Sequence, residues 1–169
     1  TRGHVELAGG IVVDCVCKEA LDTESYSDFK GNMDVDKLER LIKEFKPDII
    51  HSHTFKAGFI VRARKQSVPV IHTFHGHLLD DPEFSGFKAN VITAIEKRLA
   101  KKTSKLVSVG QRVADELVEL NVGTKEQYVN IAPGVKELSI TPRTDALKNL
   151  GITDDGRPII GWIARVTGV

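Results

Sequence analysis

Short apolar runs alternate with amphipathic stretches along most of this chain. Five of these runs have the length of buried strands: residues 11–16, 49–51, 68–73, 105–109 and 128–131. Between them, apolar side chains recur every three or four residues and predict helices: residues 34–45, 55–65 and 111–120, and a longer helix that ends near residue 102. Apolar strands that alternate with helices are typical of parallel sheets. The pattern therefore predicts an α/β fold with a Rossmann-like parallel sheet and helices on both of its faces.

The alternation stops at Pro133, where a polar stretch begins. A short helix is predicted beyond it, with Thr141 as the N-cap residue, Pro142 at the first helical position and Gly151 just past the end. We therefore expect the main domain to end near Pro133.

The last apolar run, residues 158–163, has the character of the first strand of another sheet. One strand cannot form a domain by itself, and the sequence ends at Val169. The expected organisation is one domain over residues 1–134 and, over residues 135–169, a linker followed by the beginning of a truncated second domain.

The balance of charge argues against broad electrostatic binding. The chain has 24 Lys and Arg residues, 23 Asp and Glu residues and a net charge of +1, so it has no large positive field to hold nucleic acid. No apolar run has the length of a membrane span, and the first residues lack the pattern of a signal peptide. We therefore expect a cytoplasmic protein with no nucleic-acid partner.

One helix face adds to this expectation. The helix that ends near residue 102 carries basic side chains in and after its last turns: Lys97, Arg98, Lys101 and Lys102. A basic helix face can contact anionic lipid. Peripheral contact with the inner face of the plasma membrane is therefore a further expectation.

Histidines mark the candidate site. Five of the six lie between His51 and His77, and His53, His75 and His77 stand at or just past the ends of two predicted strands. Ligands of open α/β sheets bind at that edge. Histidine can orient a hydroxyl, donate to a developing charge or ligate a metal. His51 and His72 lie within the strands, and we interpret them as structural residues.

Two other functions fit the same pattern. His51 and His53 form a His-x-His pair at a strand end, as in many metal-dependent hydrolases. Such a site needs further ligands on later strands, and no histidine follows His77. A non-catalytic Rossmann-like module that binds a sugar or a nucleotide would share the same fold. Both alternatives stay open at this point.

Two positions could hold a phosphate group. Ser108 lies at a strand-to-helix junction, where free backbone N–H groups of residues 108–111 can bind an anion. Arg165 follows the last apolar run, at a position from which its guanidinium group could clamp a diphosphate.

Several segments resemble family 4 glycosyltransferases, in order and at natural spacing, from about Asp34 to the end of the chain. These segments are KPDIIHSHT at 46–54, VPVIHTFHGH at 68–77, LVSVG at 106–110, IAPGV at 131–135 and IIGWIARV at 159–166. Enzymes of this family consist of two Rossmann domains, an architecture called GT-B. The resemblance identifies the chain as the N-terminal, acceptor-side domain with the start of the C-terminal domain.

The resemblance implies the transfer of a sugar from a nucleotide-sugar donor to an acceptor, with retention of the anomeric configuration. His75 matches the histidine near the reacting sugar and is expected to be catalytic. His53, Lys56 and His77 are expected to bind the acceptor, which would be a sugar or a lipid-linked sugar of the kind used in polysaccharide biosynthesis.

The donor side rests on the resemblance for Arg165 and on the strand-to-helix junction for Ser108. Arg165 matches the arginine that binds the donor diphosphate, and Ser108 is the second residue that we expect to bind the donor. The nucleotide sugar enters as a substrate, so no metal and no further cofactor is expected.

The sequence departs from the family pattern at both ends. Gly9 and Gly10 lack the helix pattern that follows the family's glycine-rich loop, and Ala164 replaces a glycine. The family's lysine after Arg165 and its pair of glutamates belong beyond Val169. We therefore expect an incomplete donor site, an inactive isolated chain, and a partner in the missing C-terminal domain of the same polypeptide.

Overall fold

The computed structural model describes residues 2–22, 24, 26, 32–76, 86–134 and 139–161. Its contacts divide the chain into two compact units, Thr1–Pro133 and Gly134–Val169, and each is described by itself. Of the site residues predicted from the sequence, His77 and Arg165 lie outside the described part.

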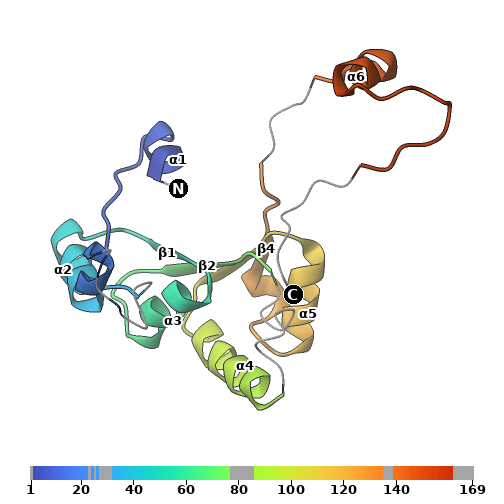
Figure 1. Cartoon of the computed structure of the whole chain (residues 1–169). Coiled ribbons are helices and arrows are strands. Elements are labelled where there is room, and N and C mark those ends of the chain that lie inside the picture. Colours follow the sequence, from blue (N-terminus) through green and yellow to red (C-terminus); the bar gives the residue numbers. More distant parts are fainter. Residues whose placement is uncertain are drawn as a thin grey trace. The chain divides into compact units, whose positions relative to one another are not determined.

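A parallel sheet forms the centre of the first unit (Figure 1). Its four strands are β1 (Ile50–His53), β2 (Val70–Phe74), β3 (Lys105–Ser108) and β4 (Tyr128–Asn130), and they lie side by side in this order. Every neighbouring pair among them is parallel. The α/β class and the Rossmann-like parallel sheet predicted from the sequence are confirmed.

Helices connect these strands. α3 (Phe55–Ala63) follows β1, α4 (Phe87–Ala100) follows β2, and α5 (Gln111–Glu119) follows β3. Because the strand order does not reverse between β1 and β4, right-handed crossovers place α3, α4 and α5 on the same face of the sheet (Figure 1). We call it the helix face. These three helices therefore do not provide the cover on the second face that the sequence predicted. Even-numbered strand residues point to the helix face, and odd-numbered ones point to the opposite face.

The chain before β1 forms shorter or less buried elements. They are α1 (Arg2–Leu7), the 3₁₀ helix η1 (Lys18–Leu21) and α2 (Val35–Phe45). Later in the chain, the 3₁₀ helix η4 (Lys125–Gln127) precedes β4. The Asp34 carboxylate caps α2 by accepting a hydrogen bond from the N–H of Lys37 at 2.8 Å. No helix in the described part of the chain is long and apolar enough to cross a membrane.

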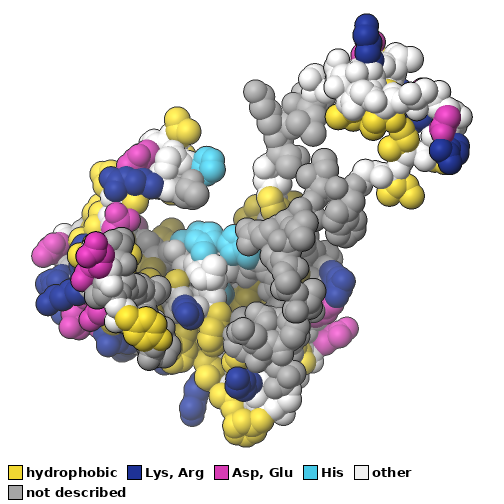
Figure 2. All heavy atoms as spheres, viewed as in Figure 1, with side chains coloured by type: hydrophobic (Ala, Val, Ile, Leu, Met, Phe, Trp, Pro, Cys, Tyr) yellow, Lys and Arg dark blue, Asp and Glu magenta, His cyan; other side chains and the backbone are white. Residues whose placement is uncertain are grey.

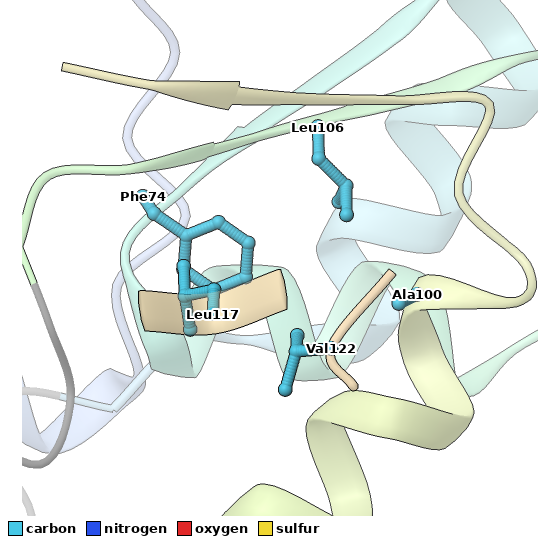
Figure 3. Packing of buried hydrophobic residues seen from close by; sticks show 5 residues of the cluster. All are labelled: Phe74, Ala100, Leu106, Leu117 and Val122. Carbon is cyan, nitrogen blue, oxygen red and sulfur yellow. The ribbon is translucent and has the colours of Figure 1, made fainter. Parts of the chain in front are cut away.

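The hydrophobic core lies on the helix face. Phe74 and Leu106 extend from β2 and β3 toward Leu117 of α5, and Ala100 and Val122 close the cluster (Figure 3). All five side chains are buried. Removing a large apolar side chain of this kind from water contributes about 1.5–3 kcal/mol. This cluster therefore holds the central strands against α4 and α5.

A buried ion pair lies beside this core. Nη2 of Arg62 in α3 is 2.9 Å from Oε1 of Glu96 in α4, and both side chains are almost completely buried. The Arg62 guanidinium also donates through Nε to the carbonyl of Gly58 at 3.0 Å and lies 5.9 Å from the ring centre of Phe74. The pair thus joins the two helices under β2. The sequence pattern did not predict that Glu96 is buried.

Gly58 allows α3 to approach the sheet closely. A Cβ atom at this position would meet the His72 ring, with 2.7 Å to Nδ1, and would lie 2.8 Å from Nη2 of Arg62. Glycine inside a helix costs about 1 kcal/mol relative to alanine. Its presence in the middle of α3 is therefore explained by the contact with His72.

The strand predicted over residues 11–16 is wrong. Residues 11–15 have no regular structure, and Val16 makes an isolated antiparallel bridge with Met33. Ile11 is 86% exposed. A strand needs a neighbour along its length, and an apolar run by itself does not supply one.

The second unit contains α6 (Arg143–Leu150) in its described part. Pro142 is the N-cap residue, so the prediction of Thr141 is wrong, whereas Gly151 ends the helix in the left-handed region at φ 67° as expected. Residues 158–161 form no strand, because they have no strand partner among the described residues. The rest of that predicted strand lies outside the described part.

Replacing Gly58 by alanine is expected to destabilise the first unit. The added methyl group would press into the buried His72 ring, and overpacking of this kind costs about 1–3 kcal/mol. Gly3→Ala is the matched control, because Gly3 also lies inside a helix, α1, and nothing lies within 4 Å of its added Cβ. Urea unfolding followed by circular dichroism would measure both. Equal midpoints for the two variants would contradict the close approach.

Candidate functional site

The candidate site lies where the parallel strands end. His53 is the last residue of β1, and His75 directly follows β2. Their side chains are brought together: Nδ1 of His53 lies 3.0 Å from Nε2 of His75. Both residues are exposed, and Figure 2 shows histidine side chains gathered in a patch on the first unit. The structure thus joins the predicted catalytic residue to one predicted acceptor-binding residue.

His51 and Thr73 continue the same face. Nε2 of His51 lies 2.7 Å from the hydroxyl oxygen of Thr73. The His51 ring also packs on the His53 ring, with ring centres 4.3 Å apart and planes inclined by 36°. We call Thr73, His51, His53 and His75 the histidine line. On each of the two adjacent strands these residues are two positions apart, so all four side chains lie on the same face of the sheet.

The bonded pair of His53 and His75 limits its own charge. A hydrogen bond between two imidazole rings needs one proton between them, so one ring donates and the other accepts. Protons on both facing nitrogens would break the bond, so the bonded pair holds at most one positive charge. In agreement, burial lowers the pKa of His53 below 6.5, and His51 and His75 lower it further. Burial and His75 also lower the pKa of His51.

The backbone turns sharply between β1 and α3. Thr54 has φ 65° and ψ 160°, a conformation that residues other than glycine rarely adopt. Such a conformation costs on the order of 1–3 kcal/mol and is concentrated at functional sites. It sets the direction in which the chain leaves His53 for the first turn of α3. This strain is independent support for a site at the end of β1.

On the helix face, Ser52 and His72 form a buried pair directly below the histidine line. The Ser52 hydroxyl oxygen is 2.9 Å from Nδ1 of His72, and both residues are buried. Burial lowers the pKa of His72 to about 3, and the charge of Arg62 contributes. His72 is therefore neutral near pH 7, in agreement with the structural role inferred from the sequence.

The other predicted residues lie nearby or outside the described part. Lys56 is in the first turn of α3 and is exposed. Ser108 ends β3, is fully buried, and its hydroxyl has no hydrogen-bond partner among the described residues. Gly110, which directly follows Val109 after β3, is the N-cap residue of α5. His77 and Arg165 lie outside the described residues.

The His51 and His53 pair of the metal-site alternative already uses one ring nitrogen of each residue in a hydrogen bond. Nε2 of His51 is bonded to the Thr73 hydroxyl, and Nδ1 of His53 is bonded to Nε2 of His75. Within residues 2–76 and 86–161, as far as the structure describes them, no group of three or more His, Cys, Asp or Glu side chains is arranged to hold a metal ion.

Sequence reasoning missed the roles of Thr73, Ser52 and Thr54. The sequence contained a signal for Thr73. Residues 51 and 53 are two apart on one predicted strand, and residues 73 and 75 are two apart at the end of the next, so each pair is expected to lie on one face of its strand. The register that brings Thr73 to His51 comes from the structure. The positive φ of Thr54 has no signal in the sequence, since a threonine does not indicate that conformation.

A family model of the glycosyl transferase 4-like domain matches residues 24–134, more than half of the chain. Among solved structures, a glycosyltransferase from Rickettsia africae ESF-5 is 14% identical and superposes with a TM-score of 0.49. The alignment covers 90% of this chain and 39% of that one.

Local similarity also exists to curated lyases. A tyrosine phenol-lyase of Intrasporangium calvum is 50% identical over 50 residues, which are 30% of this chain and 11% of the lyase. A tryptophanase of Escherichia coli is 46% identical over 48 residues, 28% of this chain and 10% of that enzyme. This chain spans about a tenth of the length of these relatives. The family model leaves residues 1–23 and 135–169 unmatched, and each of these segments is shorter than the lyase matches. The lyase matches therefore overlap the region that the family model covers.

Stability is expected to fall as the pH drops below about 6.5, because of His72. The unfolded chain binds a proton on this residue near pH 6.5, whereas the folded chain does so only near pH 3. In this window the unfolded state holds more protons, so the free energy of unfolding decreases by up to about 1.4 kcal/mol per pH unit. Urea unfolding between pH 7 and pH 5 would measure the slope.

His72→Asn isolates this contribution, because asparagine keeps a polar group toward Ser52 but does not titrate. The lowered pKa values of His51 and His53 act in the same direction and remain in the variant. Burial raises the pKa of Glu96, which acts in the opposite direction and also remains. The variant should show a shallower slope. Identical slopes would show that His72 is not the neutral buried group described here.

Proposed function

Because the chain belongs to the glycosyl transferase 4-like domain family, we propose that it is the acceptor-side half of a retaining glycosyltransferase. The reaction moves a sugar from a nucleotide-sugar donor to an acceptor hydroxyl. The observation that carries the proposal is the bonded pair of His53 and His75 at the carboxyl edge of a parallel sheet. That edge is where ligands of open α/β sheets bind.

His75 is proposed to contact the donor sugar. It is exposed at the end of β2, and its bond to His53 uses Nε2. Nδ1 is therefore the nitrogen left to face a substrate. An imidazole held in one orientation can bond a sugar hydroxyl or support the charge that develops as the bond to the leaving diphosphate breaks. Its position next to His53 supports this role.

The acceptor is proposed to lie against His53, Lys56 and His77. Lys56 follows His53 by three residues and stands in the first turn of α3, exposed. A cation and imidazole groups suit an acceptor rich in hydroxyl groups, a sugar or a lipid-linked sugar of polysaccharide biosynthesis. The basic residues at the end of α4 would let a lipid-linked acceptor be reached from the inner face of a membrane.

The donor phosphates are proposed to lie between the start of α5 and Arg165. The start of α5 directly follows β3 at the carboxyl edge of the sheet, and the N-terminus of a helix in this position can bind an anion. Because the Ser108 side chain is buried, its contribution is through the backbone at this junction. No metal or cofactor is needed in this scheme. The remaining contacts would come from a C-terminal domain of the same polypeptide in a cytoplasmic enzyme.

The coding sequence beyond Val169 is the first test. The proposal predicts a lysine a few residues past Arg165 and then a second Rossmann pattern with two glutamates seven residues apart. These groups would hold the donor diphosphate, ribose and sugar. A stop codon would favour a binding module instead, and strands bearing metal ligands would favour a hydrolase.

The completed enzyme provides the second test. Incubation with UDP-glucose and GDP-mannose and a panel of glycosides should give transfer, and NMR of the product should show the donor's anomeric configuration. His75→Ala should lower kcat on the order of 10²–10³-fold, the cost of losing one group that stabilises transition-state charge. His4→Ala, a histidine outside the site, is the matched control. The 169-residue chain alone is expected to transfer no sugar from these donors.

An unchanged kcat in His75→Ala would remove His75 from the proposed mechanism. A product of inverted configuration would reject retention.

A further inference from the structure

We propose that Thr73 and His51 are positioning residues for the pair of His53 and His75, so that the histidine line orients the reactive ring. This inference rests on the proposed function for the role of His75. The orientation itself can be tested without any sugar substrate.

The first step is the bond between Thr73 and His51. Thr73 is 4% exposed, and a buried hydroxyl needs an acceptor for its proton. Within the described residues, its hydrogen-bond partner is Nε2 of His51, at 2.7 Å. The hydroxyl therefore donates to Nε2, and the proton of the neutral His51 ring sits on Nδ1. Thr73 thus fixes both the tautomer and the rotation of this ring.

The second step is the contact between His51 and His53. The two rings lie with their centres 4.3 Å apart. His53 is exposed, and an exposed imidazole can otherwise rotate about its terminal torsion. The neighbouring His51 ring removes part of that freedom on one side. The contact with His51 therefore favours the rotation of His53 in which its Nδ1 meets Nε2 of His75.

The third step is a repeated geometry across the two strands. His51 is in register with Ile71 but bonds Thr73, and His53 is in register with Thr73 but bonds His75. Each β1 histidine therefore reaches the residue two positions beyond its register partner. The same offset occurs twice on one face. The hydrogen bond between His51 and Thr73 therefore points along β2 in the same direction as the hydrogen bond between His53 and His75.

This line decides what the site presents to a substrate. If His53 donates through Nδ1, the neutral His75 ring carries its proton on Nδ1 and faces the substrate as a donor; if His53 accepts, Nδ1 of His75 faces the substrate as an acceptor. A positioning device that holds one of these states gives the site a defined hydrogen-bonding character.

The test is long-range ¹H–¹⁵N NMR of the imidazole rings in the 169-residue chain without ligand. In the wild type, His51 should show an unprotonated Nε2 and a protonated Nδ1. Thr73→Val keeps the shape but removes the hydroxyl, so His51 should lose this single tautomer and the ring nitrogens of His53 and His75 should shift. Thr73→Ser keeps the hydroxyl and should restore the wild-type pattern.

Thr103→Val is the matched control. Thr103 is also 4% exposed, and its hydroxyl bonds the carbonyl of Leu99 at 2.8 Å, away from the histidine line. Its histidine spectrum should match the wild type. Unchanged His53 and His75 signals in Thr73→Val, no restoration by Thr73→Ser, or an equal effect of Thr103→Val would each overturn the proposal. Failure of sugar transfer by the completed enzyme would instead reject the proposed function and leave these spectra as they are.

Discussion

The parallel register between β1 and β2 is the constraint on which the candidate site depends. Ile50 pairs with Val70 and His53 with Thr73, and this register brings the odd-numbered side chains of both strands to the same face at matching heights. Because successive strand residues point to opposite faces, a slip of one residue would turn one strand's site residues toward the helices. The candidate site therefore depends on how the two strands pair, and not only on the presence of the histidines.

The helix face supplies the interactions that fix this register. His72 bonds Ser52 directly across the two strands and fills the space above Gly58. Arg62 and Glu96 then tie α3 to α4 below it, although Nη1 of the first and Oε2 of the second have no partner among the described residues. Desolvation offsets much of the attraction in such a pair. We therefore interpret these buried polar contacts mainly as determining which residues face the helices. Their net contribution to the free energy of unfolding is expected to be small.

Periodicity predicted what depends on local pattern. Apolar runs and helical stripes located the strands and helices of the sheet, and the ends of two strands located His53 and His75. Long-range packing was not predictable in this way: Glu96 is buried because it meets Arg62, 34 positions away in the chain. The failure over residues 11–16 has the same origin, since an apolar run shows that a strand is possible and not that a partner strand exists.

The two faces of β1 and β2 give histidine different roles for one physical reason, its access to water. His72 is buried beside the fixed charge of Arg62, so its pKa falls to about 3 and it serves as a neutral packing group. His53 lies two residues past His51 on β1 and is exposed, so it can exchange a proton with His75 and with solvent. Because residue parity in a strand decides the face, parity separates the exposed histidines of the candidate site from the buried His72, which a count of histidines cannot do.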